Sequence, residues 1–134
     1  MRRAGVKLSL AGGSIAICRL DAGASIPRWA SRGAFTSITR TPRELSVVCD
    51  ESTVPARVKA ERGWRALVVD GPLDFNLTGV IAGLAGVLAK AAVSVFVVST
   101  YDTDYVLVRD HAVARAVVAL RAAGYRVSTT RGVR

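Results

Sequence analysis

Residues 64–108 read WRALVVDGPLDFNLTGVIAGLAGVLAKAAVSVFVVSTYDTDYVLV, and the hydrophobic pattern changes along this stretch. Residues 64–71 form a strand-like run that stops at Gly71-Pro72. Further on, apolar residues recur at the three- and four-residue spacing of one helix face, at Leu77, Val80, Ile81, Leu84, Val87, Leu88 and Ala91. Asp74 or Asn76 is expected to cap the first turn of this helix. The sequence therefore predicts a strand followed by a helix.

After this helix the pattern returns to that of strands. Residues 93–99 are rich in β-branched side chains and short enough for a buried strand. Residues 100–104 are polar and turn-forming, and residues 105–108 are again apolar. A β-hairpin is predicted here.

A second helix and a last strand complete the order. Asp110 is expected to cap a helix whose apolar stripe runs from Val113 to Leu120, and Gly124 lies where a helix ends in a left-handed residue. Residues 125–127 form a last short strand. The resulting βαββαβ order is two split βαβ units over one sheet, the ferredoxin-like arrangement.

The first half of the chain looks like a reduced copy of the second. A shift of 61 positions sets Phe35 on Phe96, so residues 35–49 correspond to the hairpin, with a strand at residues 15–19 before it. The helices of this copy are shortened to a turn or two, at residues 26–30 and near residues 54–56. We expect domains at residues 1–62 and 63–134 that pack side by side, because a domain of ~60 residues buries only about 60% of its surface.

The length, net charge and apolar content of the chain indicate what class of protein it is. The chain has 134 residues, a net charge of +9 and 51% apolar residues, which is typical of a globular domain. Residues 77–99 carry one charge, Lys90, but their change of period argues against a membrane span. Cys18 and Cys49 are too few for a secreted scaffold, and no signal peptide is evident, so a cytoplasmic location is expected.

The run Ser99-Thr100-Tyr101-Asp102-Thr103-Asp104-Tyr105 resembles short bacterial tandem ACT-domain proteins, which are related to the ACT modules of the animal cytosolic arginine sensors. Other stretches support this resemblance over about residues 5–128: Cys18–Leu20, Ile26–Ala30, Ser37–Thr41, Glu61–Trp64 and Gly71–Phe75. It implies an α+β fold in which two ferredoxin-like ACT domains, the first with shortened helices, form one extended antiparallel sheet. It also implies that a small ligand, usually an amino acid, binds where two ACT units meet.

By this resemblance, the ligand site combines the turn between strand and helix with the end of the next strand of a neighbouring unit. The expected ligand-binding residues are Asp74, Phe75, Asn76, Leu77, Thr78, Gly79, Val98, Ser99, Thr100, Asp102 and Asp104, with Ile38 and Thr39 in the first half. Backbone N–H groups of a helix's first turn favour a carboxylate, and the aspartates favour an ammonium or a cationic side chain. Since the first half has lost most of its first helix, one site per chain is expected.

Structural roles remain open for the same residues. Asp74 and Asn76 also suit a helix cap, and Asp102 and Asp104 also suit a hairpin turn. The expected protein is a regulatory or sensing homodimer.

Catalysis is not expected, because the sole His111 begins a predicted helix, both cysteines fall in apolar strands, and no phosphate-binding or dinucleotide motif occurs. We also expect no cofactor and no metal. The alternative function is binding of nucleic acid or another polyanion, given a sequence pI of about 10.8. However, the strands at residues 65–69 and 105–108 lack the aromatic pattern of RNA-recognition modules.

Overall fold

The computed structural model describes residues 6–71 and 79–129, and the chain divides into two compact units. The C-terminal unit comprises Met1–Gly12 together with Arg65–Arg134, and the N-terminal unit comprises Gly13–Trp64. The N-terminal strand thus belongs to the C-terminal unit, although the sequence pattern placed residues 1–62 together. No helix in the described parts of the chain has the length and hydropathy of a transmembrane span.

The C-terminal unit confirms the predicted βαββαβ order. Its elements are the second half of β5 (Ala60–Val69), α1 (Val80–Lys90), β6 (Val95–Ser99), β7 (Asp104–Arg109), a 3-10 turn at Asp110–Ala112, α2 (Val113–Ala122) and β8 (Arg126–Ser128). β6 pairs antiparallel with β7, and β7 pairs with β5. Gly124, at φ 99°, follows α2 as expected.

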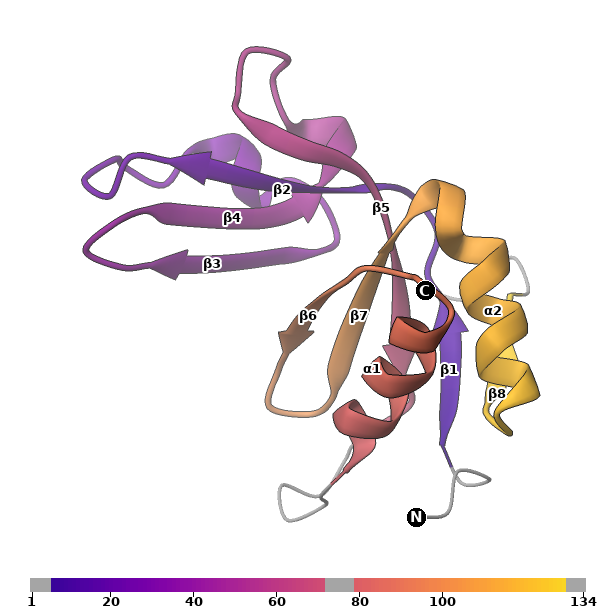
Figure 1. Ribbon diagram of the computed structural model, residues 1–134. Coiled ribbons are helices and arrows are strands. Elements are labelled where there is room, and N and C mark those ends of the chain that lie inside the picture. Colours follow the sequence, from indigo (N-terminus) through magenta and orange to yellow (C-terminus); the bar gives the residue numbers. More distant parts are fainter. Residues whose placement is uncertain (1–5, 72–78, 130–134) are drawn as a thin grey trace. The chain divides into compact units, whose positions relative to one another are not determined.

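A strand that the sequence reasoning missed, β1 (Lys7–Leu10), lies in the same unit. It pairs antiparallel with β5, where Leu8 faces Val69, and parallel with β8, where Leu8 faces Val127 (Figure 1). The sequence analysis expected a wholly antiparallel sheet, but the pairing of β1 with β8 is parallel. Val6, Leu8 and Leu10 alternate with polar residues, which is the signal of a half-buried strand.

One apolar cluster holds the helices and the sheet of the C-terminal unit together. The described part of the predicted α1 stripe is confirmed, because Val80, Leu84 and Leu88 are buried in this cluster. α2 contributes Ala116, Val117 and Leu120, and the strands contribute Leu8, Leu67, Val69, Val106, Val108 and Val127. Tertiary packing of these stripes stabilises two short helices that would be marginal alone.

The N-terminal unit is a smaller sheet with two short turns in place of helices. Its elements are β2 (Ile15–Leu20), η1 (Arg28–Ser31), β3 (Thr36–Arg40), β4 (Leu45–Asp50), η2 (Glu51–Thr53) and the first half of β5. The predicted hairpin and the shortened helices are confirmed, although the second turn lies three residues earlier than expected. Its cluster contains both cysteines together with Ala16, Ala30, Leu45, Val47 and Val54.

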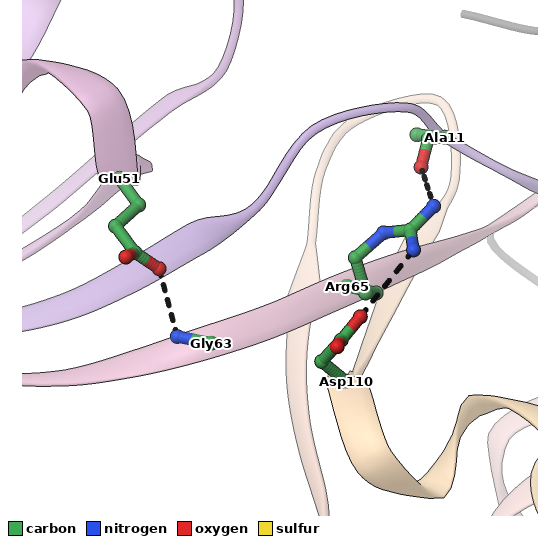
Figure 2. A network of polar contacts seen from close by, with 5 residues as sticks. All are labelled: Ala11, Glu51, Gly63, Arg65 and Asp110. Carbon is green, nitrogen blue, oxygen red and sulfur yellow. Dashed lines mark hydrogen bonds and ion pairs between the residues drawn. The ribbon is translucent and has the colours of Figure 1, made fainter.

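The strand β5 runs through both units, so the hydrogen-bonded strand order β3-β4-β2-β5-β1-β8 forms one sheet, as predicted. In the N-terminal unit, Gly63 has φ 79° and donates its N–H to Glu51 Oε1 at 2.8 Å. In the C-terminal unit, Arg65 donates to the Ala11 carbonyl at 3.2 Å and lies 3.5 Å from Asp110 (Figure 2). The bond to Glu51 thus holds the first half of β5 in the N-terminal unit, and the contacts of Arg65 hold its second half in the C-terminal unit.

Candidate functional site

The expected ligand turn is described only at its last residue. Asp74, Phe75, Asn76, Leu77 and Thr78 lie outside the described residues, as does the expected helix cap at Asp74 or Asn76. Gly79 is exposed and precedes α1 with φ 84°, and its carbonyl accepts the Gly83 N–H at 2.9 Å. A side chain at this position would strain the backbone, because φ near 80° is costly for residues with a Cβ.

The second part of the expected site is the end of β6 and the hairpin that follows it. Val98 is half-buried, whereas Ser99, Thr100 and Asp102 are exposed. Ser99 Oγ donates to Asp104 Oδ1 at 2.5 Å, a short bond of the kind formed between a hydroxyl and a carboxylate. One oxygen of Asp104 is thereby engaged by its own hairpin.

Thr100 has a structural role in the hairpin turn. Its backbone N–H and its hydroxyl both donate to the Thr103 carbonyl, at 2.8 and 3.1 Å. In return the Thr103 N–H donates to Thr100 Oγ1 at 3.2 Å. These bonds close the hairpin turn, so Thr100 shapes this part of the site.

Thr103, which the sequence reasoning treated only as a turn residue, connects the hairpin to the central strand. Its hydroxyl donates to the Val69 carbonyl at 2.5 Å. Val69 is 1% exposed, and a buried carbonyl without a partner is costly. Thr103 therefore fixes the hairpin against the last residue of β5, immediately before the expected ligand turn.

Asp70, which the sequence analysis did not single out, directly follows β5 and forms an ion pair with Lys7. Its Oδ2 lies 3.9 Å from Lys7 Nζ, and Ser9 Oγ lies 3.4 Å from its Oδ1. The Asp70 N–H donates to the Lys7 carbonyl at 2.8 Å. Only the alternation at residues 6–10 could have revealed this neighbour, because β1 is 60 residues away along the chain.

The end of β5, the start of α1 and the β6–β7 hairpin lie at the same end of the C-terminal unit (Figure 1). Residues 66–89 and 91–108 contain no Lys or Arg but four aspartates, at positions 70, 74, 102 and 104. In a chain with net charge +9, the described parts of these segments are therefore acidic, although Lys7 of β1 lies 3.9 Å from the Asp70 carboxylate. Such a site favours a ligand with a positively charged group.

Ile38 and Thr39, the expected site residues of the first half, lie in β3 of the N-terminal unit. Ile38 is half-buried against the cluster of that unit, and Thr39 is exposed. They belong to a different unit from the hairpin, and their ligand role stays a prediction.

The two cysteines are buried in the N-terminal unit, whereas the histidine is exposed. Cys18 and Cys49 are at most 1% exposed, and burial raises the pKa of the Cys18 thiol to about 11. Burial also raises the pKa of the Cys49 thiol. His111 is exposed in the turn before α2. Within the described residues, no group of three His, Cys, Asp or Glu side chains is arranged to hold a metal ion.

Two family models and one solved structure cover most of the chain. A model described as an ACT domain matches residues 59–122, and a second, described as an N-terminal domain, matches residues 13–57. A crystal structure of an Agrobacterium tumefaciens protein is 36% identical to this chain, covers 96% of each chain and superposes with a TM-score of 0.89. Residues 59–122 of this chain belong to the ACT-domain family.

Two further proteins are similar to this chain over different shares of their length. The cytosolic arginine sensor for mTORC1 subunit 1 of Bos taurus is 34% identical over 91 residues, which are 60% of this chain and 28% of that protein. The chain thus spans little more than a quarter of this curated relative. The regulatory subunit of aspartate kinase from Thermus thermophilus is 12% identical with a TM-score of 0.61, covering 91% of this chain and 99% of that one, and shares the fold.

Proposed function

We propose that this ACT protein binds a free amino acid and acts in the cytosol as a regulatory or sensing module without catalytic activity. The observation that carries the proposal is the acidic, hydroxyl-rich end of the C-terminal unit, at which both the start of α1 and the β6–β7 hairpin lie. The names of two relatives, an arginine sensor and a regulatory subunit, support it.

The chemistry of an amino acid fits the two parts of this site. Its carboxylate needs N–H donors, and a helix start such as that of α1 offers N–H groups that have no partner within the helix, together with the positive end of the helix dipole. Its ammonium needs acceptors, and exposed Asp102 lies beside Asp104 in the hairpin. The low content of basic residues around the site favours an amino acid with a cationic side chain over one with an acidic side chain.

Thermal denaturation in the presence of each of the twenty amino acids tests the proposal. A ligand at ~100 times its Kd stabilises the folded state by about 2.7 kcal/mol, which raises Tm by several degrees. We expect such a shift with one or a few amino acids, and a larger one with lysine or arginine than with glutamate. No shift with any of them, together with salt-sensitive binding to random RNA or DNA, would favour the polyanion function instead.

Substitution of Gly79 tests where the ligand binds. Gly79→Val places a branched side chain at φ 84° and is expected to abolish the ligand-induced shift in Tm. The control is Gly86→Ala, because Gly86 lies in α1 with no atom within 4 Å of an added Cβ. If Gly79→Val kept the full ligand-induced shift in Tm, the turn before α1 would not be part of the ligand site.

A further inference from the structure

The strand β1 brings a basic side chain to the acidic end of the C-terminal unit. Leu8 of β1 faces Val69 of β5, and the N–H of the next residue, Asp70, donates to the Lys7 carbonyl at 2.8 Å. Leu8 and Val69 are both buried in the apolar cluster that contains α1 and α2. Because side chains alternate along a strand, Lys7 and Asp70 lie together on the opposite face of the sheet.

The ion pair between Lys7 and Asp70 is loose. Lys7 Nζ lies 3.9 Å from Asp70 Oδ2, and the two side chains are 50% and 46% exposed. The bond from Ser9 Oγ to Asp70 Oδ1 is also long, at 3.4 Å. Exposed ion pairs contribute little to stability, and a carboxylate has about four acceptor positions. The Asp70 carboxylate can therefore exchange Lys7 for another cation at little cost.

Lys7 is a cation that comes to this end from a distant part of the sequence. Residues 66–89 and 91–108 contain no Lys or Arg. On its other side, Lys7 has exposed Arg126 as its register neighbour in β8. Like charges on neighbouring strands repel each other, which favours a position of the Lys7 ammonium close to Asp70.

The acceptors of the hairpin lie at the same end as this ion pair. The Thr103 hydroxyl donates to the carbonyl of Val69, the residue before Asp70, so the hairpin is held close to the end of β5. Asp104 is engaged by a hydroxyl of its own hairpin, and Asp102 is exposed. Asp70 differs from both hairpin aspartates because a protein cation already lies at its carboxylate.

We propose that the ion pair of Lys7 and Asp70 sets the charge selectivity of the amino-acid site, because a cationic group of the ligand takes the place of Lys7 at the Asp70 carboxylate. This inference rests on the proposed function and names the residues that decide between ligands of different charge. A cationic ligand competes with Lys7 and is attracted by Asp70. Removal of Lys7 and removal of Asp70 therefore have opposite effects on selectivity.

The test compares lysine with norleucine, which has a similar side chain without the ammonium, by titration calorimetry of the full chain. Lys7→Gln is expected to raise the ratio of lysine affinity to norleucine affinity about three- to tenfold, and Asp70→Asn to lower it by a similar factor. Lys90→Gln is the matched control for Lys7, because it removes the same charge at the opposite end of α1. Asp110→Asn is the control for Asp70, because it breaks the 3.5 Å ion pair with Arg65. Both controls are expected to leave the ratio unchanged.

Ionic strength separates an effect of charge from an effect on folding. Salt screens exposed charges, so the difference between Lys7→Gln and the wild type should shrink as salt rises from about 0.01 M to about 1 M. A loss of folding lowers both affinities together and leaves their ratio unchanged. If the wild type binds an amino acid but neither variant changes the ratio, or Lys7→Gln still binds no lysine, this inference is wrong and the proposed function stands. A wild type that binds no amino acid overturns both.

Discussion

At the scale of single residues, the side chain of Asp50 leaves no room for a Cβ at position 33, so this position requires glycine. A Cβ added at Gly33 would lie 2.1 Å from Asp50 Oδ2 and 2.7 Å from Asp50 Cβ, and the same Oδ2 accepts the Ala34 N–H at 2.7 Å. Gly33→Ala therefore forces the loop away from β4, and we expect a loss of roughly 1–3 kcal/mol in the free energy of unfolding. Gly23→Ala is the control, because nothing lies within 4 Å of its added Cβ. Equal urea midpoints for the two variants would contradict this account.

The thiol of Cys18 predicts a dependence of stability on pH. Burial raises its pKa from 9.0 to about 11, so between these values the folded state holds a proton that the unfolded chain has lost. Stability from this group is complete below pH 9 and falls as the pH rises toward 11, by on the order of 2 kcal/mol. Unfolding free energies of the wild type and of Cys18→Ala should converge over this range, and a constant difference between them would argue against the ionisation.

The acceptor and donor roles within the site were only partly predictable. Asp102, Asp104, Ser99 and Thr100 could be proposed as site residues because turn residues and a resemblance are local signals in the sequence. The bond from Thr103 to the Val69 carbonyl joins residues 34 positions apart, and its strands come together only in the sheet. No spacing along the chain encodes such a contact.

At the scale of elements, strands and helices with strong periodicity were predicted well. The stripe from Val80 to Leu88 and the β-branched run at β6 each show one clear period. β1 was missed because four residues of alternation make a weak signal, and because its partners, β5 and β8, are remote in sequence. The bounds shifted at η2, where a short turn has no hydrophobic period.

The end of α1 depends on a side chain from α2. Arg115 Nε and Nη2 donate to the Ala91 and Ala92 carbonyls, and Ala92 has φ 59°, unusual for a residue with a Cβ. We expect Arg115→Ala to lower the unfolding free energy by about 1–2 kcal/mol, and Arg115→Lys to recover only part of it, because lysine lacks the planar fork. The charge-matched control is Arg126→Ala at an exposed position of β8. The unfolding free energies are measured by denaturation with urea. If Arg115→Ala lost no more stability than the control, the bonds from Arg115 to the end of α1 would not stabilise the fold.

At the scale of the whole molecule, much of the basic charge serves the fold. Guanidinium groups donate to backbone carbonyls at Arg19, Arg40, Arg62, Arg65, Arg115 and Arg121. Arginine suits this role because its fork holds two acceptors at once. A net charge of +9 thus has a structural explanation in part, which lessens the weight of pI as an argument for nucleic-acid binding.

The two units share β5, and this predicts that they unfold together. Leu8 of β1 is 1% exposed in the C-terminal cluster, so Leu8→Ala should cost about 2–4 kcal/mol. The helices α1 and α2 report on the C-terminal unit by circular dichroism, whereas Trp29 and Trp64, the only tryptophans, report on the N-terminal unit by fluorescence.

Both transitions should move to the same lower urea concentration, because a unit of ~50 residues is marginal once the rest of its shared strand unfolds. Val118→Ala, at a position 68% exposed on α2, should move neither transition appreciably. If Leu8→Ala lowered the dichroism midpoint and left the fluorescence midpoint at its wild-type value, the N-terminal unit would be stable alone, and β5 would connect the two units without coupling their stability.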